Sequence, residues 1–183
     1  MAEHPLDPRA IANLMLDEGD RLGRGITNLA LQKLLYFAHA LFLIERKRPL
    51  VSGYFEAWEY GPVHPAVYQA FKVAKDKPIT FRACQRDIVT GIASPIPVLT
   101  EPEVVSHVVR IVSQYGSMTP SQLVNISHAK GAPWHFVVDK PRTGLALGLR
   151  ISNDIIVSRF KFHKVTVDSV VSTGEPREDS PPT

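Results

Sequence analysis

The 183-residue chain has a single cysteine, Cys84, and contains no long hydrophobic run. One cysteine excludes a disulfide framework and a zinc site built from cysteines. The longest apolar stretch, Leu34 to Ile44, is interrupted by His39 and falls short of the roughly 20 residues that a membrane helix needs. The first residues, Met1 to Pro5, have neither the basic nor the apolar segment of a signal peptide. We therefore expect a cytoplasmic protein that makes no contact with a membrane.

The chain also has little excess charge: 21 basic and 18 acidic residues leave a formal net charge of +3. Its basic residues are scattered, and the tightest group is Arg46-Lys47-Arg48. That run suits the C-terminus of a helix, where positive charge complements the helix dipole, better than a phosphate-binding patch. The sequence thus argues against nucleic acid as a partner.

Catalytic and cofactor motifs are missing as well. The chain contains no phosphate-binding glycine loop, no G-x-S-x-G and no metal-ligand spacing among its seven histidines, so neither a cofactor nor a metal is predicted. Cys84 has no nearby histidine, although Arg82 and Arg86 would favour a thiolate if both converged on the sulfur. Glu56 and Glu59 fall on opposite faces of a predicted strand. No catalytic residue is predicted, and a binding protein is expected rather than an enzyme.

What the chain does contain is helical periodicity, which predicts a mainly α fold with a small β element (α+β). Asp7-Pro8 should begin a first helix that ends at 17–20. Thr27 should cap a central, buried helix, whose apolar stripe comprises Leu31, Leu34, Leu35, Ala38 and Phe42. Further helix starts are predicted at capping boxes in 100–103 and 119–122, near His64-Pro65, near Pro133 and at Ser152, with Gly116 as a C-cap.

The rest of the chain has weaker patterns. Residues 54–60 are rich in aromatics and predict a strand that Gly61-Pro62 ends. Residues 79–96 are interpreted as irregular, and residues 165–171 as a strand or an extended arm. With 44% hydrophobic residues, the chain can bury the core of one domain, assigned to residues 1–171. The composition of residues 172–183 is that of a disordered tail.

Two features remain open on these residues alone. Gln32, Tyr36 and His39 form a polar seam on the central helix, and they either bond to neighbouring backbone or face a site. The aromatic residues Trp58, Tyr60, Tyr68 and Trp134 occur near Gly-Pro and Gly-Ala-Pro turns. Such residues serve both protein cores and interface hot spots.

Two segments carry a resemblance to a known family. Ile26 to Ala38, which contains L-Q-K-L-L-Y, and Phe55 to Val63, which contains A-W-x-Y-G-P-V, are together similar to the SocA-like antitoxin family. This family is also called the Panacea domain and includes phage-associated GepA-like proteins. The resemblance covers residues 8–162. It implies a mostly helical fold and an antitoxin, without catalytic activity, that binds a cognate protein toxin encoded nearby. Some relatives carry an added DNA-binding domain, for which this chain has no room.

Neutralising a toxin by binding needs a shaped face rather than catalytic groups, and the central helix, the strand and the segments after them supply candidate residues for such a face. They are Gln32, Tyr36, His39, Glu56, Trp58, Tyr60, Pro62, Val63, His64, Tyr68 and Trp134. Two alternatives remain open at this point. One is an adaptor that delivers a toxin to a protease, as one family member does, and the other is a small hydrolase that uses Cys84 or a histidine. The sequence leaves the oligomeric state open.

Overall fold

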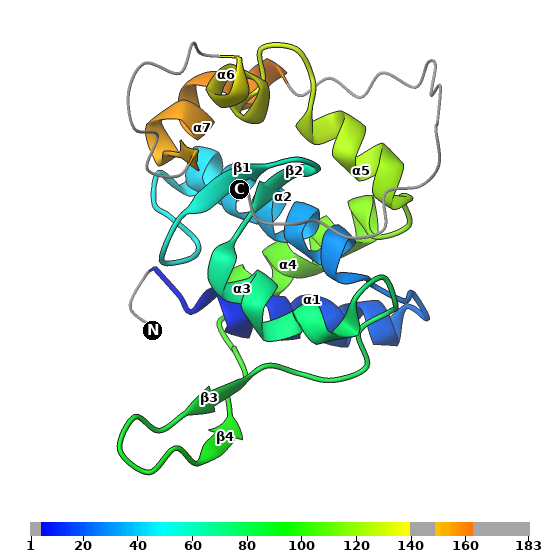
Figure 1. The fold of residues 1–183 in the computed structure, drawn as a ribbon, viewed down its shortest axis with the longest axis vertical. Coiled ribbons are helices and arrows are strands. Elements are labelled where there is room, and N and C mark those ends of the chain that lie inside the picture. The colour runs from blue at the N-terminus through cyan, green and yellow to red at the C-terminus, as the bar shows by residue number, and fades with distance from the viewer. Residues whose placement is uncertain (1–4, 140–148, 163–183) are drawn as a thin grey trace.

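A central helix, α2, organises the molecule. The computed structural model describes residues 5–139 and 149–162, and within them most of the other helices pack around α2 (Figure 1). The α-helices are α1 (Pro8–Arg21), α2 (Asn28–Arg46), α3 (Pro65–Phe71), α4 (Pro102–Tyr115), α5 (Pro120–Ser127), α6 (Pro133–Val138) and α7 (Asn153–Arg159). Short 3-10 turns follow α3 and α7, at Lys72–Ala74 and Phe160–Phe162. The predicted mainly α fold with a small β element is confirmed.

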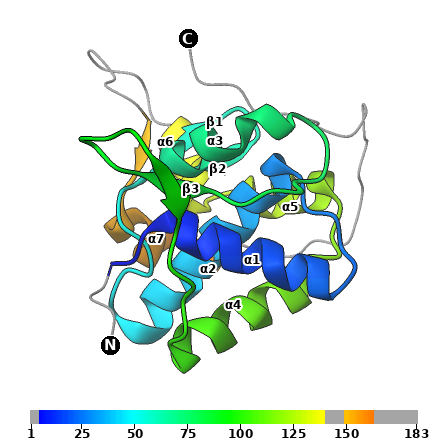
Figure 2. The ribbon, with the colours of Figure 1, turned by 90° about the horizontal axis from the view of Figure 1, so that it is seen from below.

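Burial explains the place of α2. Its predicted apolar stripe is inside the protein, since Leu31, Leu34 and Leu35 are fully buried. Helix α2 contacts α1, α3, α4, α5 and α7, so it is covered on most sides. Helix α1 lies in turn between α3 and α4, as the view from below shows (Figure 2). No helix among the described residues is long and apolar enough to span a membrane.

The helix starts follow local hydrogen bonds. Asp7 accepts a bond from the backbone of Arg9 at 2.8 Å, and Thr27 accepts one from Ala30 at 3.3 Å, as the sequence predicts. Thr119 and Gln122 form both arms of a capping box. Ser152 caps α7, and Gly116 is the C-cap of α4. In these places the sequence-based boundaries are confirmed because the determining contacts span at most four residues.

Two small sheets complete the fold. Strand β1 (Phe55–Trp58) lies between β2 (Gly61–Val63) and β5 (Arg150–Ile151), and both neighbours are antiparallel to it. Strands β3 (Cys84–Arg86) and β4 (Ala93–Pro95) form a separate antiparallel hairpin. This second hairpin projects from the end of the molecule that is opposite α6 (Figure 1).

Three sequence predictions are wrong in detail. Gly61-Pro62 does not end the strand region but begins β2, where proline is tolerated because β2 is an edge strand. Residues 79–96 contain the β3–β4 hairpin, which the sequence hides because it lacks alternating apolar residues. Helix α4 begins one residue later than the capping box predicts: Glu101 is the N-cap and makes no side-chain cap bond, and Pro102 takes the first helical position.

Two other predictions lie outside the described residues. The arm at 165–171 and the tail at 172–183 both fall there. The assignment of residues 1–171 to one domain therefore stays a prediction.

Candidate functional site

The two segments that carry the family resemblance contact each other. The backbone N–H of His64 donates to Gln32 Oε1 at 3.0 Å, and Lys33 Nζ donates to the carbonyl of Pro62 at 3.0 Å. Gln32 also donates to Asn28 Oδ1 at 3.0 Å. Lys33 and Gln32 are fully buried. The L-Q-K part of α2 therefore holds the G-P-V part of β2 through buried hydrogen bonds, which supply partners for polar groups that burial would otherwise leave unsatisfied.

Gly61 shows how closely β2 approaches the helices beneath it. Its φ of +106° lies in a region that side chains rarely adopt, and an added Cβ would lie 2.5 Å from Ser127 Oγ and 3.0 Å from Lys33 Cε. Glycine is therefore required here for both backbone conformation and space.

Aromatic side chains pack around the β1–β2 hairpin. Trp58 is only 4% exposed and packs edge-on against Tyr68, with ring centroids 4.7 Å apart. Its indole N–H donates to Glu56 Oε2 at 2.8 Å. The carbonyl of Trp58 accepts a 2.7 Å bond from the indole of Trp134, which stacks on His128 at 3.6 Å. Trp58 and Tyr68 thus belong to the core, whereas Trp134 is half-buried at its edge.

The polar seam of α2 is bonded inside the protein. The backbone N–H of Val51 donates to His39 Nδ1 at 3.4 Å, so Nε2 carries the proton that it shares with Asn153 Oδ1 at 2.9 Å. Burial lowers the pKa of His39 to about 4 and raises the pKa of Tyr36 well above its ordinary value. Of the two interpretations left open, the structure supports bonding to neighbouring groups.

Two further histidines near this site each have a buried ring nitrogen without a partner among the described residues. His64 Nε2 donates to the carbonyl of Ser52 at 2.9 Å, so its unpaired Nδ1 is unprotonated. The unpaired atom of His128 is Nε2. Burial lowers the pKa of His64, and it lowers the pKa of His128 to about 4. No group of three His, Cys, Asp or Glu residues in the described part of the chain could hold a metal ion.

The structure divides the eleven candidate toxin-binding residues by exposure. Eight of them are buried inside the protein, namely Gln32, Tyr36, His39, Trp58, Pro62, Val63, His64 and Tyr68. The other three, Glu56, Tyr60 and Trp134, are partly accessible. We call these three the rim. Contact with a toxin stays a prediction for every one of the eleven.

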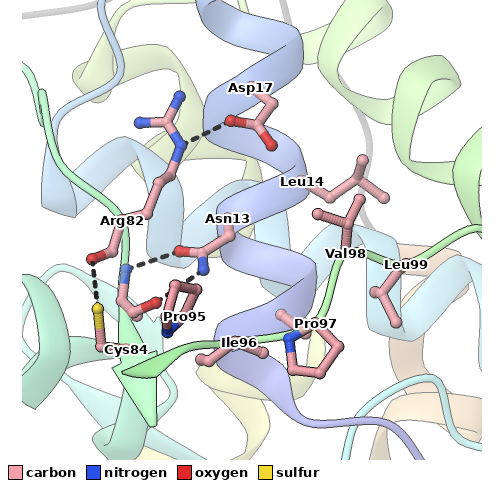
Figure 3. A pocket seen from close by; sticks show the side chains of 12 residues that line it. Asn13, Leu14, Asp17, Arg82, Cys84, Pro95, Ile96, Pro97, Val98 and Leu99 are labelled. Carbon is pink, nitrogen blue, oxygen red and sulfur yellow. Dashed lines mark hydrogen bonds and ion pairs between the residues drawn. The ribbon is translucent and has the colours of Figure 1, made fainter. Parts of the chain in front are cut away.

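A groove of about 390 Å³ lies elsewhere, between α1 and residues 95–99 (Figure 3). Its lining is largely apolar and includes Leu14, Ile96 and Val98, with the Cys84 thiol at the edge. No histidine lines it. No sequence pattern predicts this groove, because the residues that line it are far apart in the chain.

The two arginines beside Cys84 in the sequence do not converge on its sulfur. Arg82 turns its guanidinium to Asp17 and Asp20, at 2.7 and 2.6 Å, and Arg86 bonds to the carbonyl of Gly91 at 3.0 Å. Neither guanidinium is bonded to the sulfur, whose partner is the carbonyl of Arg82 at 3.9 Å (Figure 3). The arginines that flank Cys84 in sequence therefore serve other contacts.

Comparison with known proteins adds two findings. A family model described as "Antitoxin SocA-like, Panacea domain" matches residues 31–135. The chain is also 45% identical over 177 residues to the protein named "Antitoxin SocA" from Caulobacter vibrioides (strain NA1000 / CB15N), an alignment that covers 97% of this chain and 94% of that protein. No solved structure matches the chain.

Proposed function

The chain belongs to the SocA-like antitoxin family with a Panacea domain, and from this premise we propose that it neutralises a cognate protein toxin by binding it directly. The observation that carries the proposal is the near full-length similarity to a protein named as an antitoxin. The alignment includes both segments that carry the family resemblance, residues 26–38 and 55–63. The proposal therefore concerns the whole chain rather than one shared motif.

The rim is the part of the predicted site that a partner can reach. Tyr60 and Trp134 are aromatic, and such side chains give rigid contact area at interface hot spots. The bond from Trp134 to Trp58 and the stacking on His128 fix the indole before any partner arrives. A contact surface that is already ordered loses less entropy on binding, which favours affinity. This mode of action needs shape and hydrogen bonds, and no catalytic group.

Co-expression tests the proposal. The chain and the product of the adjacent gene are produced separately and together, and growth is measured. We expect the neighbour alone to stop growth, the pair to grow, and the two purified proteins to form a complex. Growth arrest that co-expression does not relieve would contradict an antitoxin role. A steady fall of the neighbour protein during rescue, abolished by deleting a protease, would replace direct blocking by delivery for degradation.

A matched pair of variants tests the rim. Tyr60→Ala should weaken rescue, and Tyr54→Ala is the control, because Tyr54 is also an accessible tyrosine but lies at the other end of β1. Circular dichroism and thermal melts of both variants show whether the fold is kept. Equal rescue by two folded variants would remove Tyr60 from the contact surface.

A further inference from the structure

The β3–β4 hairpin exposes an apolar cluster at its tip. Ile88 and Val89 are fully or almost fully exposed, at 101% and 94%, and Ile92 is 66% exposed. Such a concentration differs from the single exposed apolar residues found over most protein surfaces, and contiguous apolar patches mark interaction sites. The strands below the tip add nothing to the core, because every residue of β3 is exposed and no residue of β4 is buried. The hairpin therefore has no evident role in stabilising the fold.

The turn that carries this cluster is held by one carboxylate. Asp87 Oδ1 accepts bonds from the backbone of Val89 at 2.9 Å and from the backbone and hydroxyl of Thr90 at 2.6 and 2.9 Å. Gly91 supplies the positive φ that closes the turn. Isoleucine and valine are stiff at χ1, so they lose little freedom on binding. The tip is thus a preorganised apolar knob rather than an unstructured loop.

The base of the hairpin is fixed to α1. Asn13 exchanges two hydrogen bonds with the backbone of Ala83, at 2.9 and 2.8 Å, and Arg82 pairs with Asp17 (Figure 3). Arg82 also pairs with Asp20. Arg9 donates to the carbonyl of Cys84 at 3.4 Å. These polar residues recur along one face of α1 at intervals of three and four, which is the helical period. These contacts therefore hold the hairpin in a fixed position relative to α1.

The charge near the tip limits the chemistry of the partner. Asp87 uses its carboxylate within the turn, whereas Arg86 is exposed and makes no ion pair with any described residue. A complementary surface would combine an apolar hollow with acidic groups at its edge.

We propose that the tip of the β3–β4 hairpin, formed by Ile88, Val89 and Ile92, docks in an apolar, acid-rimmed pocket on the toxin. This inference rests on the proposed function, because the toxin is the protein partner that an antitoxin must hold. It adds a contact surface at the end of the molecule opposite α6 and the rim. A bilayer fits the tip less well, since membrane-binding segments combine aromatic anchors with several cations and the tip offers one arginine.

The test uses the full chain and the purified product of the adjacent gene. The double variant Ile88→Ser/Val89→Ser should bind the product of the adjacent gene at least about tenfold more weakly than the wild type does. Its melting temperature should be unchanged. Val73→Ser is the matched control: Val73 is 74% exposed on another element and should bind as the wild type does. Arg86→Glu should slow association and reduce the salt dependence of binding.

Each of the remaining outcomes would overturn the docking of the hairpin tip on the toxin and would identify a different explanation. If the wild type binds and the double variant binds equally, the hairpin is not the docking surface, although the proposed function stands. If the wild type does not bind, both fail. Self-association that the double variant abolishes would assign the tip to a second copy of this chain. Tip-dependent binding to vesicles of phosphatidylglycerol and phosphatidylethanolamine would assign it to a membrane.

Discussion

The two hairpins of this protein use their side chains in opposite ways. The β1–β2 hairpin turns almost everything inward: Trp58, Val63 and Gly61 are buried, and Lys33 reaches up from α2 to bond its backbone. The β3–β4 hairpin turns its large apolar residues outward and is hydrogen-bonded to α1 at its base. A turn between short strands can thus either belong to the core or stay exposed.

The contrast shows that most of a family signature can serve packing inside the protein. The A-W-x-Y-G-P-V segment identifies the family, yet the structure uses most of it to pack β1 and β2 against α2, α3 and α5. Ile88, which has no part in the signature, is fully exposed. Four comparisons test this division, beginning with the largest expected effect.

The two hairpins should differ most clearly in how much a truncated side chain lowers the free energy of unfolding. Trp58→Ala should lower the free energy of unfolding by about 3–5 kcal/mol, because it leaves a cavity against Tyr68. Ile88→Ala should change it by less than about 0.5 kcal/mol, since that side chain is fully exposed. Urea denaturation measures both. Similar losses of unfolding free energy in the two variants would contradict the distinction between a buried and an exposed hairpin.

The buried core around α2 and the exposed β3–β4 turn should also differ in their response to acid. Burial lowers the pKa of His39 to about 4 from an unfolded value of 6.5, so the unfolded state binds more protons below pH 6.5. Stability should fall as the pH drops from 6.5 to about 4, by roughly 3 kcal/mol for this group. Backbone bonds from Thr90 lower the pKa of Asp87 below 3.8, so the exposed turn should keep its carboxylate contacts until the pH falls further.

Urea denaturation of the wild type and of His39→Gln across this range checks the first effect. The variant should show a shallower decline, and His64, His107 and His128, whose pKa values are also lowered by burial, contribute to the remaining slope. Identical slopes would mean that His39 is protonated in the folded protein.

Two glycines with positive φ provide a finer comparison. Gly61→Ala places a Cβ 2.5 Å from Ser127 Oγ, in addition to the backbone strain, and should cost about 2–3 kcal/mol. Gly91 has a φ of +69° but nothing within 4 Å of an added Cβ, so Gly91→Ala should cost only the backbone strain of about 1 kcal/mol. Melting temperatures rank the two, and the reverse order would show that β2 can move away from α5.

The smallest effect is expected at Cys84. Cys84→Ser should leave both stability and toxin rescue unchanged, within about 0.5 kcal/mol, because the thiol is exposed and bonded only weakly to Arg82. Growth rescue and thermal melts check this. A folded variant that fails to rescue would favour the hydrolase interpretation over the antitoxin.

Features that depend on neighbours along the chain could be predicted from the amino-acid sequence. Asp7, Thr27 and Thr119 mark helix starts correctly because a cap bonds a backbone group two or three residues away. The apolar stripe of α2 follows from the helical period alone, and two motifs, read together, were enough to indicate the family.

Which polar and aromatic residues face inward depends on contacts between distant parts of the chain. Gln32 meets His64 across 32 positions, and Asn13 meets Ala83 across 70, so no local pattern reveals either contact. The same side chains favour a core and an interface, which left Trp58 and Tyr68 ambiguous until their packing was seen. The β3–β4 hairpin was missed because strand prediction depends on one buried face, and this hairpin buries neither.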